Sequence, residues 1–537
     1  MPLQEPAGFG PFRPGSIVRL AHAGWVLARE GVIRAIAPPD PPALGRLVLA
    51  ACRLIERRGL ARVARSARVS EALNRLGPSY VKLGQFLATR PDVVGQEMAD
   101  DLEALQDRLT AFPKPEALAA IERALQRPIS ALFASIGEPV AAASIAQVHR
   151  AEVIDADGSS HAVAVKVLRP DIEARFRRDL DSFYLAARIL ERLVPPIRRL
   201  RPVAIVDTLA RSVRLEMDLR LEAAALSELA ENTAGDPGFR VPKVDWVRTA
   251  KGVLTLEWVD GMKLADRDKL IASGHDPVAL SKVVMQSFLR HAMRDGFFHA
   301  DMHQGNLFVD RQGTLVAVDF GIMGRLNPAE RRFLAEILYG FIRRDYLRVA
   351  QVHFEAGYVP AGEEVDVFAQ ALRAVGEPLR DRPAREISMA HLLSQLFEYT
   401  EVFHMATQPR LILLQKTMVV VEGVARSLDP DLDIWTTSEP VVREWIERNL
   451  GPLAVLGEAG DSISALGRLA LALPRFAERA ERISAGFALM ADKGMRLDDD
   501  TVERLAAAEA RGTRWGRIAL WIGALSLAAI AAHMFAL

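Results

Sequence analysis

The residues best suited to chemistry form an ordered set of two acids and an amide in the middle of the chain. Asp301 stands five residues before Asn306, and Asp319 opens an Asp-Phe-Gly turn. An acid at the first position can accept the proton of an attacking hydroxyl, while an amide and a second acid can hold Mg²⁺ against phosphate groups. The apolar runs around residues 311–313 predict two short strands joined by a turn, which would bring both acids to one edge. The set predicts a magnesium-dependent site for a nucleoside triphosphate. Acidic turn residues beside core strands are the plainer alternative.

Such a site also needs a lysine on a strand and an acid that holds this lysine in place, both upstream. Lys166 interrupts the apolar strand predicted over residues 163–167. The helical stretch at 215–225 offers three acids, which point in different directions because successive helical residues differ by about 100°. The residues themselves leave both Glu216 and Glu222 open as the partner of Lys166.

The loop expected to cover the phosphates is rich in alanine, where such loops are normally rich in glycine. Each β-carbon restricts φ and keeps the backbone farther from a ligand. A phosphate chain is therefore expected to lie differently here than in a protein kinase, which speaks against ordinary phosphoryl transfer to protein. A plain helix start capped by Ser144 is the alternative for this run. The loop residues expected at the nucleotide are Ala141, Ala142, Ala143 and Ser144.

A strand that ends near Glu257 passes into a glycine-containing link, which we interpret as a hinge between two lobes. The backbone of Glu257 and Val259 would contact the adenine there. After Gly321 the chain enters a helix almost at once, near Asn327, so no activation segment for docking peptides is recognisable. The fold class indicated is α+β, a protein-kinase-like bilobal fold with a helical N-terminal extension and a helical C-terminal region.

Together these residues resemble the UbiB family of atypical kinase-like proteins, which are tied to ubiquinone biosynthesis. The chain matches the family in order at the alanine loop, at Lys166 and at the acids of 215–225. It also matches at Asp301, Asn306 and Asp319. The sequence Lys-Leu-Gly-Gln at 82–85 is similar to the family's Lys-x-Gly-Gln motif, on a helix ahead of the kinase-like part. The chain departs from the family at Met302 and Gln304, where Pro is usual, and at Ala225, where Asn is usual. Altered loop packing is expected from these departures, with nucleotide binding retained.

The resemblance implies a role for each matching residue. Glu222 would be the partner of Lys166, Asn306 and Asp319 would hold Mg²⁺, and Asp301 would serve the nucleophile, whether water or an unknown hydroxyl. A gate would lie over the place where a protein substrate binds, with two residues of the motif helix restrained by two acids. The residues of this gate are Lys82, Gln85, Glu216 and Asp218.

The function implied is that of a Mg²⁺-dependent ATPase or phosphotransferase that binds ATP (or ADP) and supports ubiquinone biosynthesis at the membrane. Its partners would be membrane lipids, polyprenyl ubiquinone intermediates and ubiquinone biosynthetic proteins. The alternative is a nucleotide-gated scaffold, or a chaperone of lipid intermediates, without transfer chemistry. The alanine loop and the gate favour this alternative, and the retention of Asp301 opposes it.

Composition excludes several other classes of protein. Equal numbers of basic and acidic residues, 68 of each, leave no strongly basic character for binding nucleic acid. Cys52 is the only cysteine, which rules out an internal disulfide and a multi-cysteine zinc site. A hydroxylase is disfavoured because no Gly-x-Gly-x-x-Gly follows a strand, and because Glu-x-x-His occurs once, at 401–404, where a di-iron bundle needs two. Residues 1–13 lack the pattern of a signal peptide.

Residues 518–537 carry no charge and are long enough for a helix that crosses the hydrocarbon core at roughly 1.5 Å per residue. Arginines precede this run and none follows it. The positive-inside rule then places the bulk of the chain on the cytoplasmic side of the inner membrane of a bacterium, with a single C-terminal anchor. A helix packed on the core is the alternative. Of the upstream helices, 16–36 is expected to pack on the core, while the arginines after Ala43 suit either anionic headgroups or water.

The sequence thus predicts five segments. They are a helical extension with the Lys-x-Gly-Gln motif (1–135), a kinase-like N-lobe (136–260), a kinase-like C-lobe (261–450), a helical segment (451–515) and a transmembrane helix (516–537).

Overall fold

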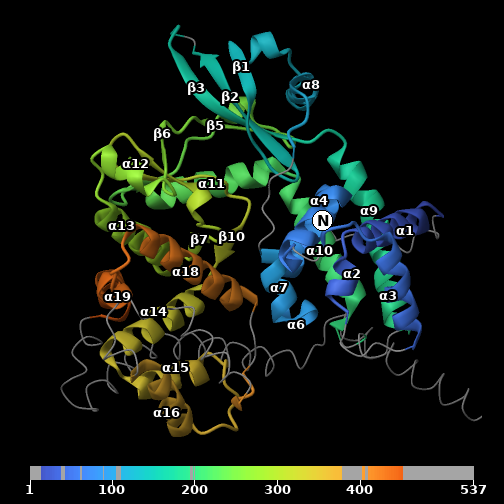
Figure 1. Ribbon diagram of the computed structural model, residues 1–537. Helices are drawn as coiled ribbons and strands as arrows, with labels where there is room; N and C mark the ends of the chain where they lie inside the picture. The colour runs from blue at the N-terminus through green and yellow to red at the C-terminus, as the bar shows by residue number, and fades with distance from the viewer. Residues whose placement is uncertain are drawn as a thin grey trace, which may run out of the picture. The chain divides into compact units, whose positions relative to one another are not determined.

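The computed structural model describes residues 14–37, 43–60, 63–88, 90–103, 110–155, 157–193, 198, 200–377, 402–405 and 409–451. The chain divides into two compact units, Met1–Trp445 and Ile446–Leu537, and the fold given below is that of the first with the few described residues of the second, 446–451 (Figure 1).

The N-terminal extension is helical over most of its described residues. In α4 the apolar positions recur on one face, and Val69, Leu73 and Leu76 are buried. Gly77 ends this helix with a positive φ of 99°, which a residue with a β-carbon rarely adopts. Pro78 then begins α5, where a missing N–H costs nothing. The helices of the extension are α1 (Pro14–Arg29), α2 (Val32–Ala35), α3 (Ala43–Ile55), α4 (Arg65–Leu76), α5 (Pro78–Ala88), α6 (Pro91–Val94) and α7 (Gln96–Glu103).

The small lobe is an antiparallel sheet in the order β1-β2-β3-β5, with α8 packed on one face. Val163, Val165 and Val167 of β3 are buried with Ile121 of α8. Because side chains alternate along a strand, Lys166 lies on the opposite face. The elements are α8 (Lys114–Leu125), η2 (Ile129–Ala131), β1 (Ser135–Ala142), β2 (Ala146–Ile154), β3 (Ser160–Leu168) and β5 (Val253–Glu257).

Three helices follow β3 before the chain returns to the sheet. Two of them meet at a sharp turn, where α10 ends at Glu216 and Asp218 caps the start of α11 by accepting the N–H of Arg220. The elements are α9 (Ile172–Leu193), α10 (Pro202–Glu216), α11 (Leu219–Thr233), β4 (Phe239–Arg240) and η4 (Trp246–Arg248).

The large lobe carries short strands on a helical body. One small sheet has the order β4-β9-β8-β6, and β7 pairs with β10. The strands and turns are β6 (Gly261–Lys263), the π-helix η5 (His291–Asp295), β7 (Phe297–His299), η6 (Gln304–Asn306), β8 (Leu307–Asp310), β9 (Leu315–Ala317) and β10 (Met323–Arg325). The helices are α12 (Arg267–Ala272), α13 (Pro277–Arg290), α14 (Pro328–Arg343), α15 (Tyr346–Glu355), α16 (Val365–Gly376), α18 (Pro409–Leu428) and α19 (Ile434–Leu450).

The structure decides several expectations. The two strands predicted around 311–313 are confirmed as the antiparallel pair β8 and β9. The helix predicted near Asn327 begins there, because Asn327 and Glu330 form a reciprocal capping box. The alternative of a helix start in the alanine run is wrong, since β1 continues to Ala142 and β2 begins at Ala146. Strand β10, between Gly321 and α14, was not predicted.

No helix among the described residues is long and apolar enough to cross a membrane. The transmembrane helix predicted over 516–537, and the helical segment predicted over 451–515, lie outside the described residues apart from Gly451. Both remain predictions.

Candidate active site

Three charged side chains from separate segments meet between the lobes: Lys166, Glu222 and Asp319, which we call the trio. Lys166 Nζ donates to both carboxylate oxygens of Glu222, at 2.8 and 2.9 Å, and to Oδ1 of Asp319 at 3.0 Å. Glu222 is buried, whereas Asp319 keeps about half of its side-chain surface accessible (51%). The ammonium therefore bridges an interior acid to one that a ligand can reach.

The turn between α10 and α11 explains which acid meets Lys166. Because Asp218 caps α11, Glu222 falls in the first turn of that helix and points toward β3. Glu216 ends the preceding helix and pairs with a different lysine, Lys82, at 2.6 Å. The choice that the residues alone left open is thus settled by the cap.

The charges of the trio depend on one another. Burial lowers the pKa of Lys166, but the Asp319 and Glu222 carboxylates outweigh it and raise that pKa above its usual range. The Lys166 ammonium holds the pKa of Asp319 well below its usual range against the effect of burial, and Lys82 adds to this lowering. Burial raises the pKa of Glu222, with Lys166 acting in the opposite direction. Asp319 is therefore firmly anionic at neutral pH.

The backbone at Asp319 is held in a left-handed conformation, with φ of 64°. The next residue, Phe320, donates its N–H to Glu222 Oε1 at 3.3 Å, and its ring packs edge-on against that of His299, with centroids 5.1 Å apart. These contacts fix the direction in which the Asp319 carboxylate leaves the chain.

His299 joins the two acidic segments. Its Nδ1 accepts the N–H of Asp301 at 3.0 Å, so Nε2 carries the proton and donates to the carbonyl of Val318 at 3.3 Å. Burial lowers the pKa of His299, which fits a neutral ring. This histidine was not among the predicted site residues. Its position two residues before Asp301 was the available signal.

Asp301 and Asn306 lie together, as their spacing predicts. Asn306 Nδ2 donates to the backbone carbonyl of Asp301 at 3.1 Å and lies 3.5 Å from its Oδ2. Asn306 is buried, while the Asp301 side chain is 45% accessible, with His303 Nε2 3.7 Å from its carboxylate. The accessible carboxylate of Asp301 is thus free to reach a hydroxyl or a water molecule.

The residues fit a magnesium ion chemically. Asp319 and Asn306 offer oxygen ligands, which Mg²⁺ prefers, and Asp319 already holds a cation in the form of the Lys166 ammonium. Among the described residues there is no cluster of three or more His, Cys, Asp or Glu arranged for a metal. A Mg²⁺ ion that takes one or two carboxylates and completes its shell with phosphate and water needs no such cluster.

Two of the four residues of the predicted gate form an ion pair, and the gating role itself stays a prediction. The Lys82–Glu216 ion pair joins α5 to the end of α10, and both side chains are mostly buried. Lys82 also lies close enough to Asp319 to lower its pKa, although the Lys166 contribution is larger. Gln85 is partly buried, one turn along α5. Asp218 caps α11 and pairs with the Arg220 guanidinium.

The predicted hinge follows β5. Glu257 is the last residue of this strand, and its N–H donates to the carbonyl of Lys243 at 2.8 Å. Its carboxylate accepts from Arg240 at 2.9 Å, and Arg240 also donates to Asp310 of β8 at 3.0 Å. The start of the link is thereby fixed to the large lobe. Val259 lies just beyond, in the link itself.

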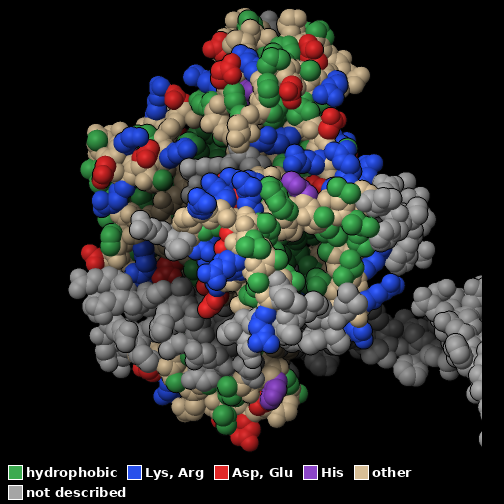
Figure 2. Space-filling model, turned by 45° about the vertical axis from the view of Figure 1, so that its right-hand side comes forward, with side chains coloured by type: hydrophobic (Ala, Val, Ile, Leu, Met, Phe, Trp, Pro, Cys, Tyr) green, Lys and Arg blue, Asp and Glu red, His purple; other side chains and the backbone are tan. Residues whose placement is uncertain are grey.

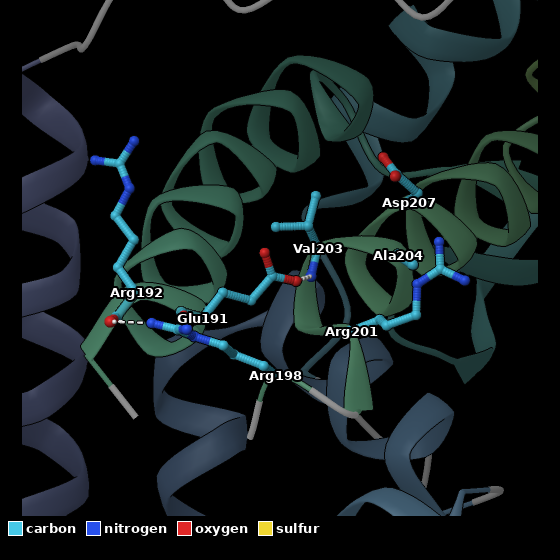
Figure 3. Close-up of a pocket in the computed structure, with 7 residues that line it drawn as sticks. All are labelled: Glu191, Arg192, Arg198, Arg201, Val203, Ala204 and Asp207. Atoms are coloured by element: carbon cyan, nitrogen blue, oxygen red, sulfur yellow. Dashed lines mark hydrogen bonds between the residues drawn. The ribbon is translucent and has the colours of Figure 1, made fainter. Parts of the chain in front are cut away.

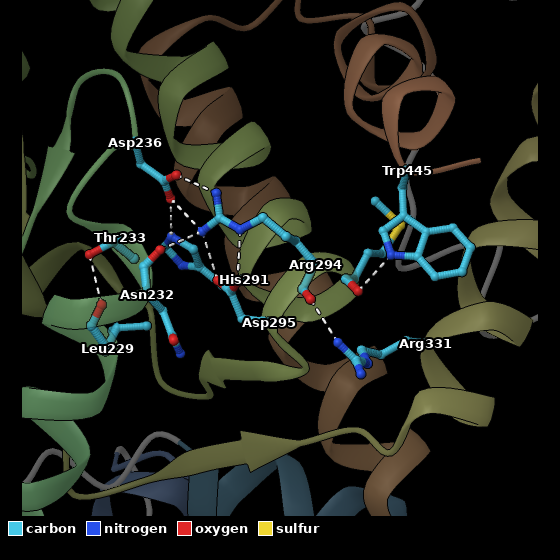
Figure 4. Close-up of polar contacts among 10 residues, drawn as sticks. Leu229, Asn232, Thr233, Asp236, His291, Arg294, Asp295, Arg331 and Trp445 are labelled. Atoms are coloured by element: carbon cyan, nitrogen blue, oxygen red, sulfur yellow. Dashed lines mark hydrogen bonds and ion pairs between the residues drawn. The ribbon is translucent and has the colours of Figure 1, made fainter. Parts of the chain in front are cut away.

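A buried polar cluster fixes the far end of α11 to the large lobe (Figure 4). Arg294 of the π-helix donates to Asp236 at 2.5 Å and to the carbonyl of Asn232 at 2.9 Å. Buried His291 contacts the same Asp236 through Nε2 at 3.2 Å. Although burial raises it, His291 and Arg294 hold the pKa of Asp236 at about 2. The helix that carries Glu222 is therefore anchored at both ends.

A cavity of about 590 Å³ lies elsewhere, between the end of α9 and the start of α10 (Figure 3). Glu191 caps α10 there by accepting the N–H of Val203 at 3.1 Å, and Asp207 accepts the hydroxyl of Tyr184 at 2.6 Å. None of its lining residues belongs to the trio or the gate. The lining residues are Glu191, Arg192, Arg198, Arg201, Val203, Ala204 and Asp207.

Comparison with known proteins agrees with this geometry. The model of the ABC1 atypical kinase-like domain matches residues 104–353, and that of the UbiB helical domain matches residues 372–433. A protein of Marinobacter nauticus named "Probable protein kinase UbiB" is 42% identical over 400 residues, which cover 74% of this chain and 72% of that protein. The chain belongs to the UbiB family. UbiB proteins are atypical, kinase-type proteins implicated in ubiquinone biosynthesis, as the resemblance predicted.

Other UbiB relatives are similar over the same extent. The protein from Azotobacter vinelandii is 39% identical, with 76% of each chain covered, and that from Pseudomonas fluorescens is 39% identical, covering 76% of this chain and 77% of the relative. A solved protein of Mycobacterium tuberculosis in complex with erythromycin aligns with 68% of this chain and 97% of its own, at 22% identity and a TM-score of 0.45.

Proposed function

We propose that this UbiB protein binds ATP with Mg²⁺ between its lobes and either hydrolyses it or transfers its phosphoryl group, in support of ubiquinone biosynthesis at a membrane. The observation that carries the proposal is the Lys166 ammonium, held at once by buried Glu222 and accessible Asp319. A strand lysine fixed in this way is suited to the α- and β-phosphates of a nucleotide.

The remaining residues take complementary parts. Bound Mg²⁺ would neutralise charge on the phosphates, and Asp319 and Asn306 are the residues that would hold it. Asp301 is placed to accept a proton from the attacking water or hydroxyl, because its carboxylate is accessible and Asn306 and His299 fix its backbone. The backbone around Glu257 and Val259 would receive the adenine.

A nucleotide-gated scaffold remains the second candidate, and one contact favours it. The Lys82–Glu216 pair keeps a second cation near enough to Asp319 to lower its pKa, and the family resemblance assigns these residues to a gate over the site of a protein substrate. A site covered in this way suits ATP binding and lobe movement better than transfer to a protein. The two candidates differ in whether Asp301 is needed.

Membrane lipids are the proposed partner, and an exposed apolar face supports this. On α1, Val18 and Trp25 lie two turns apart on the same stripe and are 68% and 46% exposed. On α3, which packs beside α1, Leu54 is 87% exposed. Arg29 lies over the Trp25 ring at 5.0 Å, and Arg53 flanks Leu54. Figure 2 shows hydrophobic side chains gathered over these N-terminal helices, with basic side chains beside them.

Apolar side chains bordered by arginine suit the interface of an anionic bilayer. The helix expected to pack on the core does so through its other face, where Ser16, Ala23 and Val26 are buried. The polyprenyl intermediates of ubiquinone biosynthesis would be reached from such a surface.

The catalytic part of the proposal is tested with the full chain in lipid nanodiscs, by Mg²⁺-dependent release of phosphate from ATP with and without a phenolic ubiquinone-precursor mimic. Asp301→Asn is expected to lose turnover and to retain ATP binding. If Asp301→Asn keeps its turnover, or if wild-type protein binds ATP without any turnover, the scaffold is the better account.

The membrane part is tested with a nitroxide label at Leu54→Cys, in a Cys52→Ser background, on full chain bound to anionic vesicles. Val247→Cys, at a site 70% exposed on the small lobe, is the matched control. The label at 54 is expected to be shielded from a water-soluble nickel chelate and accessible to oxygen only when vesicles are present. Equal accessibility at 54 and 247 would reject this face. Shielding at 54 without vesicles would mean that another part of the chain covers it.

A further inference from the structure

The alanine loop is held from behind by one arginine. Arg169, the residue after β3, donates through Nε and Nη2 to the carbonyl of Ala143, at 3.2 and 2.9 Å. Its Nη2 also donates to the carbonyl of Thr110 at 2.9 Å, and its own N–H donates to the carbonyl of Ile145 at 2.8 Å. Backbone and guanidinium of a single residue therefore grip both sides of the turn between β1 and β2.

The grip comes from the face of the sheet opposite to the site. Lys166 points to the face of β3 away from α8, whereas Arg169, the first residue after the strand, packs toward α8. The guanidinium lies over the ring of Phe112 at 5.5 Å, and Phe112 packs against the core between the sheet and α8. The carbonyl of Ala143 is thus drawn toward the α8 side.

A peptide unit then transmits this orientation to the site. The C=O of Ala143 and the N–H of Ser144 belong to one trans peptide, in which they point in opposite directions. With the carbonyl held toward α8, the Ser144 N–H is turned toward the face that carries Lys166. Backbone N–H groups aimed in this way are what a loop uses to contact phosphate oxygens.

Phe112, whose ring lies under the Arg169 guanidinium, is itself held in place by buried polar side chains. Gln147 accepts the N–H of Phe112 at 2.9 Å and donates to its carbonyl at 3.2 Å. The same amide contacts His149 Nε2 at 2.8 Å, and His149 Nδ1 donates to the carbonyl of Gly137 at 3.0 Å. Gln147 and His149 are both fully buried. This chain of contacts links β1, β2 and the segment before α8, so the arginine has a rigid base.

We infer that Arg169 is a positioning residue for nucleotide phosphates, acting through the Ala143–Ser144 peptide of the alanine loop. A glycine-rich loop adapts its backbone to the phosphates, whereas alanine has fewer conformations to choose from. In this chain the Arg169 guanidinium orients the Ala143–Ser144 peptide before the nucleotide binds, whereas a glycine-rich loop would adjust its backbone during binding. The role as a phosphate-positioning residue rests on the proposed nucleotide function. The contacts by which Arg169 holds the loop do not depend on that function.

The grip is tested first, without nucleotide, by amide hydrogen exchange in the full chain. Arg169→Met is expected to speed exchange at residues 143–146 at least tenfold, since the loop loses its anchor. Arg248→Met is the matched control, because Arg248 also donates to a backbone carbonyl, that of Leu132 at 2.6 Å, and lies over a ring, that of Phe133 at 5.9 Å, away from the loop. Unchanged exchange at 143–146 in Arg169→Met would overturn the inference.

The effect on phosphates is tested by competition of ATP, ADP and adenosine against a fluorescent ATP analogue. Arg169→Met is expected to weaken ATP and ADP about tenfold, which corresponds to ~1.4 kcal/mol, and to leave adenosine within about twofold. Arg169→Lys keeps the charge but loses the planar fork, so it is not expected to restore affinity. Rescue by lysine, or an equal loss for adenosine, would contradict positioning through the loop.

The two hypotheses fail in different ways. If wild-type protein binds no ATP, the proposed function fails, while the exchange experiment still decides whether Arg169 holds the loop. If wild-type protein binds ATP and Arg169→Met binds it equally well, the positioning role fails and the nucleotide function stands.

Discussion

Two acids six residues apart, Glu216 and Glu222, hold two different lysines in two different surroundings. Glu222 is buried and grips Lys166 with both oxygens, in a pair that belongs to the lobes themselves. Glu216 holds Lys82 through one oxygen and joins the lobes to the helical extension. The Glu222 contact lies within the kinase-like core, whereas the Glu216 contact joins that core to α5 of the N-terminal extension.

The comparison suggests different consequences when each pair breaks. Removing one partner of a buried pair leaves a charge without compensation, which costs roughly 3–5 kcal/mol. Glu216 keeps 19% of its side-chain surface accessible, against 8% for Glu222, so water can solvate its carboxylate and loss of the Lys82 pair should cost less, about 1 kcal/mol. The Lys166–Glu222 pair (the inner pair) should therefore be needed for folding and nucleotide binding. The Lys82–Glu216 pair (the outer pair) should control access of substrates to the site.

The largest effect is expected from Lys166→Met. It leaves Glu222 buried and Asp319 without its ammonium, so the free energy of unfolding should fall by roughly 3 kcal/mol and ATP affinity should drop below detection. Urea denaturation and nucleotide titration measure the two effects. Lys263→Met, on β6 away from the trio, is the control, and a Lys166→Met protein as stable as this control would contradict the inner-pair account.

A smaller and more specific effect is expected from Glu222→Gln. The amide keeps the shape of the side chain, and Asp319 still holds Lys166, so the loss of stability should be about 1–2 kcal/mol. Because Lys166 is then drawn toward Asp319 alone, turnover of ATP should fall by more than its affinity. Separate measurement of kcat and of ATP affinity for the variant and for wild type decides this, and an affinity that falls by more than kcat would contradict it.

The mildest variants are those of the outer pair. Lys82→Ala and Glu216→Gln should each change the free energy of unfolding by about 1 kcal/mol or less. ATP turnover should rise several-fold, since the cation beside Asp319 is removed or loosened. Their combination should add little to either alone. A turnover lowered to the level of Glu222→Gln would show that both pairs belong to one catalytic unit, and would contradict separate roles for the two pairs.

The pH dependence of stability should come mainly from buried histidines. Burial lowers the pKa of His291, His299 and His353, so below about pH 6.5 the unfolded chain binds protons that the folded protein does not. Stability is then kept above that pH and lost as pH falls, by up to about 1.4 kcal/mol per pH unit for each histidine. Thermal melts between pH 7 and 5 should show a shallower decline for His353→Gln than for His22→Gln, at an exposed position.

The sequence predicted the local parts of the site best. Strands β8 and β9 and the cap of α14 follow from short apolar runs and capping residues, which act within a few positions. Lys166 was found because a single charge interrupts an apolar strand. Contacts between distant segments could not be obtained in this way, because no local pattern encodes them. The Lys82–Glu216 pair came only from the family resemblance.

What the residues could not decide is also instructive. The choice between Glu216 and Glu222 depends on the cap at Asp218, which breaks one predicted helix into two. The part played by Arg169 depends on a carbonyl in a turn, and backbone orientation leaves no mark on composition or periodicity. The role of His299 in linking the Asp301 and Asp319 segments depends on its contact with the carbonyl of Val318, which is distant in sequence.

The most direct test of the central claim is Mg²⁺-dependent binding and hydrolysis of ATP by full-length protein in nanodiscs, comparing wild type with Asp319→Asn. Asp260→Asn, at an exposed site paired with Arg311, is the control. The account predicts wild-type behaviour for the control and loss of both binding and hydrolysis, by at least a hundredfold, for Asp319→Asn. Wild-type Mg²⁺–ATP affinity in Asp319→Asn would contradict the assignment of the site.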